Sequence, residues 1–124
     1  MKQKIILIAV FIGIATNAYA DKCEDACGYS CTRIVNAIYK AEGGNRTKYP
    51  YGIKSVSCDS VTECRRICLN TVKNNVDRWM TARELGDNRD YLTFLWHRYC
   101  PPQANELNSN WLKNVKYFLN KQED

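Results

Sequence analysis

The 124-residue sequence contains no internal repeat, no low-complexity tract and no linker-like stretch. A chain of this length without a boundary signal is typical of one domain with a modest core. The net charge is +5, but the sequence contains no dense basic patch interleaved with aromatic residues. It therefore does not favour nucleic acid as a partner. A mildly basic balance suits a partner with scattered negative charge, such as a bacterial wall or an anionic glycan.

The sequence also lacks an apolar run long enough to cross a bilayer. The run at residues 5–15 is shorter than the roughly 20 residues that a transmembrane helix needs. Lysines precede this run and an Ala-Tyr-Ala triplet follows it, which is the pattern of a cleaved secretory signal peptide. We therefore expect residues 1–20 to be removed before Asp21. Residues 21–124 are then a periplasmic or secreted domain that is not stably inserted in a membrane.

Cysteine is abundant in the part that remains after this cleavage. Seven cysteines lie there: Cys23, Cys27, Cys31, Cys58, Cys64, Cys68 and Cys100. In an exported chain of this size they predict a disulfide framework. Because seven is odd, three bridges leave one thiol, either free or in a disulfide-linked dimer. Zinc bound by thiolates and the single histidine, His97, is the alternative, and an oxidising compartment disfavours it. We expect no metal and no cofactor.

Helical periodicity dominates the sequence. We expect helices over about residues 23–42, 60–79 and 88–99, and from residue 109 onward. The first ends at a double glycine, and Ser60-x-x-Glu63 begins the second as a capping box. Residues 45–57 combine helix breakers with residues that favour extended structure, which predicts a loop with one small hairpin. The predicted class is mainly α, with a short β or loop segment after the first helix.

The spacing of the cysteines suggests how they bridge. Two Cys-x-x-x-Cys pairs, at residues 27–31 and 64–68, each place two thiols one turn apart on one helix face. If the first two helices pack antiparallel, these pairs predict two bridges between them. Cys58 and Cys100 lie at helix boundaries, where a third bridge fastens a loop.

One carboxylate has a distinctive setting. Glu42 ends the first, apolar helix and is followed by two glycines. Apolar neighbours and the negative end of the helix dipole both disfavour its charged form, so we expect a raised pKa, as a general acid for a glycosidic oxygen requires. The glycines leave space for a polymer chain. Tyr49 and Tyr51, in the loop that follows, are candidates for stacking on sugar rings.

These motifs resemble the lysozyme-like lytic transglycosylases. The stretch Glu42-Gly43-Gly44 is similar to their Glu-Ser-Gly motif, and Gly-Ile-Lys-Ser at residues 52–55 looks like a shortened form of their Gly-Leu-Met-Gln turn without its glutamine. Residues 68–75, 78–79, 98–102 and 110–111 are similar to small exported bacterial proteins of this kind.

The resemblance implies a lysozyme-like, disulfide-stapled helical domain that cleaves peptidoglycan glycan strands between N-acetylmuramic acid and N-acetylglucosamine. It implies that Glu42 acts as acid and then as base while the sugar's own 6-hydroxyl attacks, giving a 1,6-anhydro product. A hydrolase usually needs a second carboxylate, and none here stands in a matching motif. The candidates for substrate binding are Tyr49, Tyr51, Ser55, Asn70 and Asn74.

A second interpretation is a non-catalytic, disulfide-rich secreted binding protein, such as a lysozyme inhibitor or a wall-binding factor. The two interpretations differ in the setting of Glu42. An enzyme needs this carboxyl in an open groove with polar groups nearby. A binding protein has it paired with a lysine or arginine, or on a convex face.

Export predicts the first residue of the mature protein. Mass spectrometry of protein recovered from the periplasm or the medium of an expressing bacterium is expected to find Asp21 at the N-terminus. A mature protein that retains Met1 contradicts export, and with it the oxidising compartment on which the predicted disulfide framework depends.

Overall fold

The computed structural model describes residues 20–53, 58–101, 104 and 106–121 and is mainly helical. The predicted signal segment lies outside the described residues. The α-helices are α2 (Lys22–Cys27), α3 (Cys31–Ala41), α4 (Val61–Glu84), α5 (Tyr91–Tyr99) and α6 (Trp111–Lys121). Three 3₁₀ turns accompany them: η1 (Gly44–Arg46), η2 (Pro50–Gly52) and η3 (Glu106–Asn110). The described residues include no strand, so the expected hairpin is replaced, in the described part of that segment, by η1 and η2.

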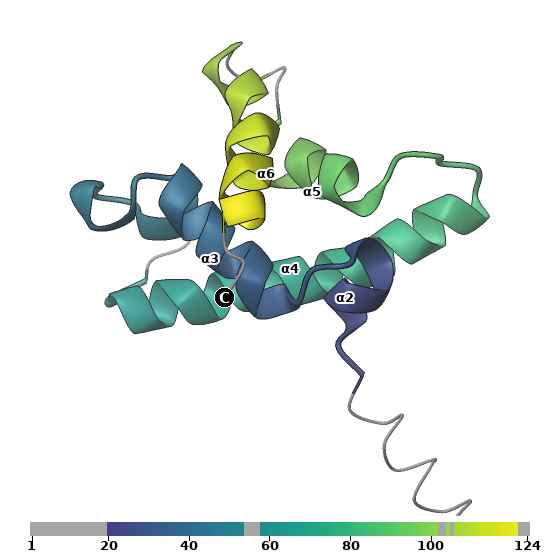
Figure 1. The fold of residues 1–124 in the computed structure, drawn as a ribbon, viewed down its shortest axis with the longest axis horizontal. Coiled ribbons are helices and arrows are strands. Elements are labelled where there is room, and N and C mark those ends of the chain that lie inside the picture. The colour runs from purple at the N-terminus through teal and green to yellow at the C-terminus, as the bar shows by residue number, and fades with distance from the viewer. Residues whose placement is uncertain (1–19, 54–57, 102–103, 105, 122–124) are drawn as a thin grey trace, which may run out of the picture.

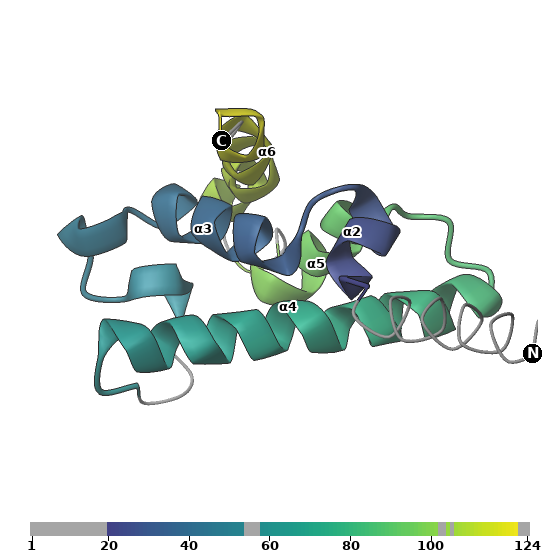
Figure 2. The ribbon, with the colours of Figure 1, turned by 60° about the horizontal axis from the view of Figure 1, so that its bottom comes forward.

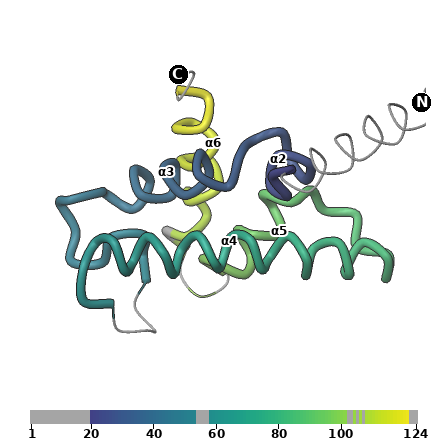
Figure 3. The backbone as a smooth tube through the Cα atoms, turned by 90° about the horizontal axis from the view of Figure 1, so that it is seen from below, coloured from purple at the N-terminus to yellow at the C-terminus, as the bar shows by residue number. Residues whose placement is uncertain are grey.

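The long helix α4 contacts α2, α3, α5 and η2. Figure 1 and Figure 2 show α3 and α2 following one another along α4, with α6 crossing α3 on the side away from α4. The tube in Figure 3 shows the same row of α2 and α3 beside α4. Helix α5 contacts α2, α4 and α6 and so closes the space between them. Helix α3 therefore lies between α4 and α6.

The core is one cluster of apolar side chains from all five α-helices. Its fully buried members include Ile34, Val35, Ile38, Val72, Val76, Tyr91, Leu95, Val115 and Leu119. Burying one such aliphatic side chain stabilises a fold by about 1.5–3 kcal/mol, so this cluster is the main source of stability. The apolar stripes predicted for the helices around residues 60–79 and after 109 supply much of the core, although Val61, at the start of α4, is 52% exposed.

The first predicted helix is in fact two helices. Gly28, with φ +84°, ends α2 in the left-handed conformation, and the Ser30 hydroxyl accepts a hydrogen bond from the Arg33 backbone N–H to begin α3. The Asp21 carboxylate caps α2 in the same way by accepting from the N–H of Cys23. The prediction of one helix was wrong because the four-residue spacing of the cysteines continues unchanged across the break.

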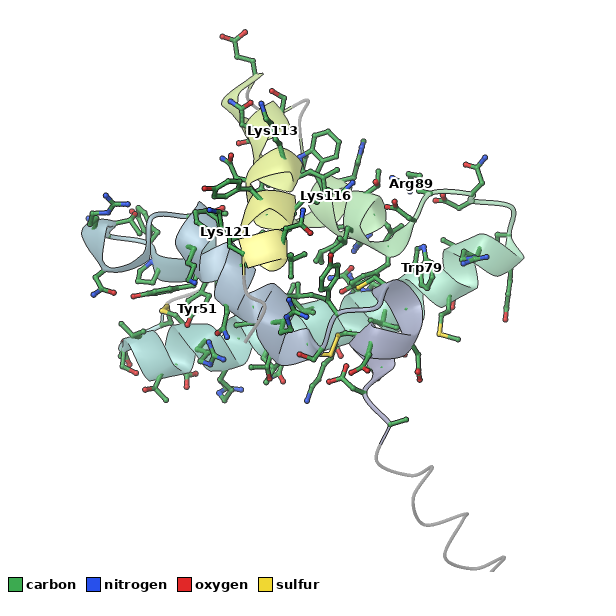
Figure 4. All side chains as sticks on the ribbon, in the orientation of Figure 1. Tyr51, Trp79, Arg89, Lys113, Lys116 and Lys121 are labelled. Carbon is green, nitrogen blue, oxygen red and sulfur yellow. A yellow bond between two sulfur atoms is a disulfide. The ribbon has the colours of Figure 1, made fainter. Side chains whose placement is uncertain are left out.

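The capping box at the start of α4 forms in one direction. The Ser60 hydroxyl accepts a hydrogen bond from the Glu63 backbone N–H at 3.1 Å, as predicted. The Glu63 carboxylate does not complete the box; it pairs with Arg66 one turn along, and this hydrogen bond lowers the pKa of Glu63. At the far end, the Trp79 indole N–H donates to the Arg89 carbonyl at 2.8 Å, which ties α4 to the segment before α5 (Figure 4).

The disulfides are local, so the predicted bridges between the first two helices were wrong. Cys23 pairs with Cys31 across the α2–α3 turn, and Cys58 pairs with Cys64 across the start of α4. The break at Gly28 brings the first pair to a Cα–Cα distance of 5.0 Å, which a disulfide spans without backbone movement. Three cysteines belong to neither bridge: Cys27, Cys68 and Cys100. The count of three bridges was therefore also wrong.

The pairing can be mapped directly. Proteolysis of the unreduced protein and mass spectrometry are expected to recover linked peptides for Cys23–Cys31 and Cys58–Cys64. Replacing Cys58 and Cys64 together by serine should lower the free energy of unfolding by about 2 kcal/mol, because the bridge closes a short loop. Replacing Cys27 by serine, which touches neither bridge, is the control. A linked peptide that joins α3 to α4 contradicts this pairing.

Candidate functional site

Glu42 lines an open pocket of about 350 Å³ that four separate parts of the chain build. These parts are the end of α3, the turn η2, the end of α5 and the junction of η3 with α6. The residues that line the pocket are Ala41, Glu42, Gly52, Tyr99, Cys100, Pro101, Asn108, Asn110, Trp111 and Asn114. Packing of α3 against α6, and of η2 against α3, holds these parts together.

The position of Glu42 follows from the way α3 ends. Its backbone N–H donates to the Ile38 carbonyl at 2.9 Å, so Glu42 is the cap residue directly after the last helical position. The chain then turns away at Gly43, which has φ +98°. Ile38 is fully buried in the core, so the packing of α3 fixes where the Glu42 backbone lies. The predicted end of the helix at Glu42 is confirmed.

Gly52 packs directly against the carboxyl group of Glu42. A Cβ atom on Gly52 would lie 2.5 Å from Glu42 Oε2 and 2.7 Å from Cδ, both inside van der Waals contact. Gly52 also has φ +69°, a conformation that disfavours side chains. Only glycine therefore lets the η2 backbone reach the carboxyl in this way. The structure brings together the two segments, around Glu42 and around Gly52, on which the family resemblance rests.

The wall contributed by η3 and α6 is rich in amide groups. Asn108, Asn110 and Asn114 line the pocket, and each side-chain amide offers both donors and an acceptor. Asn108 fastens the wall, because its Nδ2 donates to the Pro101 carbonyl at 2.9 Å. Asn110 and Asn114 are exposed. They are four residues apart, so they lie on one side of the start of α6.

Two stacked aromatic rings support this wall. Tyr99 and Trp111 lie with ring centroids 5.3 Å apart at 27°, and both line the pocket. The indole nitrogen of Trp111 is buried and has no hydrogen-bond partner in the described part of the chain. The sequence indicated Tyr99 and Trp111 as apolar residues on helix stripes and as part of the family resemblance, not as site residues. The Asn110-Trp111 pair, with Asn114 one turn later, is the signal that could have pointed to this wall.

Tyr51, a predicted sugar-binding residue, is part of the core. Its side chain is 2% exposed, and its ring is tilted against that of Tyr39 at 5.0 Å. Its hydroxyl accepts a hydrogen bond from Arg65 at 3.3 Å, and its carbonyl accepts one from the Tyr99 hydroxyl. Figure 4 shows it beside the end of α3, close to α4. The structure therefore leaves the Tyr51 ring no open face for a sugar.

The other predicted substrate residues that the structure describes do not line this pocket. Tyr49 is 39% exposed in the same loop, and Lys48 lies over its ring. Asn70 and Asn74 are exposed on α4. Ser55 lies outside the described residues. Among the predicted catalytic and substrate-binding residues that are described, the structure places Glu42 alone in the pocket.

Among the described residues, one group of side chains has its possible ligand atoms close enough together to hold a metal ion. This group is Asp21, Cys23 and Cys31. The two cysteines are joined in a disulfide, so they offer no thiolates, and the Asp21 carboxylate is engaged as a helix cap. His97 lies edge-on against Trp96 at 4.8 Å, away from this group. Among the residues described, therefore, no assembled set of ligands for zinc is present.

Comparisons with protein-family models, with curated proteins and with solved structures found no match to this chain. The resemblance to lytic transglycosylases therefore rests on the sequence motifs. In the part of the chain that the structure describes, no helix is both long and apolar enough to cross a membrane.

The contact between Gly52 and Glu42 can be measured with glycine substitutions. Gly28→Ala and Gly52→Ala both place a side chain in the left-handed region, which costs about 1–2 kcal/mol. Only the Cβ at residue 52 meets another group, since nothing lies within 4 Å of a Cβ at residue 28. Gly52→Ala should therefore lower the free energy of urea unfolding more than Gly28→Ala does.

Shortening Glu42 isolates the contact. In a Glu42→Ala background the alanine at residue 52 no longer meets a carboxyl, so its cost should fall to that of Gly28→Ala. If Gly52→Ala costs the same with and without the Glu42 carboxyl, the two groups do not touch as the structure describes.

Proposed function

We propose that this chain is an exported enzyme that cleaves the glycan strands of peptidoglycan, with Glu42 as its acid–base residue. The observation that carries the proposal is the place of the Glu42 carboxyl, in an open pocket lined also by three asparagines and two stacked aromatic rings. A pocket of about 350 Å³ is in the range of small-molecule sites, which suits the sugar at the reacting bond. The sequence motifs around residues 42–44 and 52–55 support the same function.

The proposed reaction uses one carboxyl group twice. The protonated Glu42 carboxyl gives its proton to the glycosidic oxygen as the bond from that oxygen to C1 of the muramic acid breaks. The Glu42 carboxylate then takes the proton of the 6-hydroxyl of that sugar as this oxygen bonds to C1. The product is a 1,6-anhydro sugar, and Glu42 returns to its protonated form without using water.

The composition of the pocket supports this chemistry over hydrolysis. Glycosidases that use water usually hold two carboxyl groups, about 5–5.5 Å apart when they retain and about 6.5–9.5 Å apart when they invert the configuration. Of the described residues that line the pocket, Glu42 is the only acid. The amides of Asn110 and Asn114 suit the acetamido and hydroxyl groups of the substrate.

The charge of the surface near the pocket fits a wall polymer. Helix α6, which begins at the pocket, carries exposed Lys113, Lys116 and Lys121, and the segment Trp111–Lys121 contains no acidic residue (Figure 4). Such a face attracts anionic polymers at low ionic strength. The charge supports action on an anionic polymer such as the bacterial wall, which an exported protein meets in the periplasm or outside the cell.

A non-catalytic binding protein is the second candidate, and a different feature favours it. A hollow of about 480 Å³ lies between α2 and α4, where Val76, Trp79 and Met80 lie among charged side chains. Met80 is 55% exposed. Exposed methionine beside an apolar hollow is typical of surfaces that bind other proteins. A lysozyme inhibitor or a wall-binding factor would use such a surface and would show no cleavage.

Glu42→Gln tests the proposed function. The amide keeps the shape of the side chain and removes the acid–base proton, so release of soluble fragments from purified peptidoglycan should fall by about 10²–10⁴-fold. Glu84→Gln, which changes another carboxyl at the end of a helix far from Glu42 in sequence, is the matched control and should keep the parent activity. Anhydro-sugar ends among the products support the transglycosylase reaction, whereas reducing ends indicate hydrolysis.

Two outcomes oppose the proposal in different ways. If folded Glu42→Gln is as active as the parent, cleavage depends on another residue. If the parent cleaves no peptidoglycan, the second candidate, a non-catalytic binding protein, replaces the enzyme.

A further inference from the structure

The backbone at Tyr51 is strained, and the strain lies beside Glu42. Tyr51 has φ +66° and ψ +7°, and it is the one residue other than glycine with positive φ in the described part of the chain. An aromatic residue rarely adopts this conformation, and it persists only where the surrounding structure enforces it. The next residue is Gly52, whose Cα packs against the Glu42 carboxyl. The strain therefore lies one peptide bond from the glycine that packs against the proposed acid–base residue.

Contacts from three directions enforce the conformation of Tyr51. Its ring packs on Tyr39, its hydroxyl accepts from Arg65, and its carbonyl accepts from the Tyr99 hydroxyl. Arg65 is itself held by Asn36, whose Oδ1 accepts from the same guanidinium nitrogen at 2.8 Å. Of these contacts, only the one from Tyr99 reaches the backbone, at the carbonyl of the peptide that joins residues 51 and 52.

Tyr99 is suited to act as a fixed donor. Its ring is stacked on Trp111, and its hydroxyl oxygen lies 3.5 Å from the sulfur of Cys68, which is buried. Burial raises the pKa of Tyr99, and nearby Cys68 and Glu42 raise it further, so the hydroxyl keeps its proton at neutral pH. A rigid ring with a permanent donor holds the 51–52 peptide in one orientation.

We propose that Tyr99 is a positioning residue for Glu42: its hydroxyl holds the Tyr51 carbonyl, and so sets the Gly52 backbone against which the Glu42 carboxyl rests. This inference rests on the proposed function for its effect on catalysis. Without the hydroxyl, the 51–52 peptide keeps the hydrogen bond that the Gly52 N–H donates to the Tyr49 carbonyl at 2.8 Å, but its carbonyl loses its donor and the peptide can tilt away from its strained orientation. The surface behind Glu42 then shifts, and the carboxyl no longer meets the glycosidic oxygen in one geometry. A small displacement at a reacting group is enough to lower a rate strongly.

The experiment compares Tyr99→Phe with Tyr91→Phe. Both tyrosines are at least partly buried, and the hydroxyl of each donates to a backbone carbonyl, that of Tyr91 to Val72 at 2.6 Å. Each variant keeps the ring and loses one hydrogen bond to a backbone carbonyl, and Tyr99→Phe also loses the longer contact with the Cys68 sulfur. Because a contact to sulfur at this distance is weak, both variants should show similar losses of thermal stability. Only Tyr99→Phe alters the support of Glu42. On soluble peptidoglycan fragments its kcat should fall about 10–100-fold with little change in KM, while Tyr91→Phe keeps the parent kcat.

A second measurement does not depend on activity. The carboxyl carbon of Glu42 can be observed by NMR in protein labelled with ¹³C-glutamate, with Glu42→Gln identifying the signal. The resonance should move in Tyr99→Phe and stay in place in Tyr91→Phe. If the parent is inactive, the proposed function fails, and this resonance alone decides whether Tyr99 positions Glu42.

The inference is overturned if Tyr99→Phe matches Tyr91→Phe in kcat and leaves the Glu42 resonance unmoved. Should Tyr99→Phe fail to fold, replacement of Tyr99 by 4-fluorophenylalanine provides the same comparison, because it fills the place of the hydroxyl and removes the donor to the Tyr51 carbonyl. An unmoved Glu42 resonance in this variant then overturns the inference, and a moved one supports it.

Discussion

The burial of α3 between α4 and α6 is the constraint on which the rest of the structure depends. Ile34, Val35 and Ile38 on this helix are fully buried and belong to the single core cluster. The two disulfides do not hold this arrangement, because each closes a short loop at the end of a helix. Apolar packing therefore does most to set how α3, α4 and α6 lie together, and it carries most of the stability. Side-chain hydrogen bonds from α4 to α3 and from α3 to α6 add to it.

This packing also explains why a pocket forms where it does. The last turns of α3 pack in the core, and Glu42 follows the last helical residue directly. The position of the Glu42 backbone is therefore fixed by the packing of α3. The beginning of α6 and the turn η2 both pack on α3, and both line the pocket around Glu42. A carboxyl placed by the core and surrounded by separate segments is more rigid than one on a free loop, which is what acid–base chemistry requires.

The sequence predicted the features that arise from local patterns. Apolar periodicity predicted α4 and α6, and the double glycine predicted the end of α3 at Glu42. The break at Gly28 was missed because the cysteine spacing of four residues masks it, and the disulfide pairing was then wrong. The amide wall of the pocket was missed because tertiary packing, not spacing, brings residues 108–114 to Glu42. Tyr51 was misjudged because sequence alone does not show whether an aromatic ring in a loop is buried.

The residues with positive φ show where the backbone of this small fold is conformationally strained or depends on glycine. Of the six residues with positive φ in the described part of the chain, four lie in the two segments that meet at Glu42: Gly43, Gly44, Tyr51 and Gly52. The glycines bear little cost, but Tyr51 requires about 1–2 kcal/mol, which burial of its ring is able to offset. A glycine at residue 51 would remove the strain and also the ring that packs on Tyr39. A tyrosine here therefore makes the turn rigid at the cost of backbone strain, and the next residue in that turn, Gly52, packs against the Glu42 carboxyl.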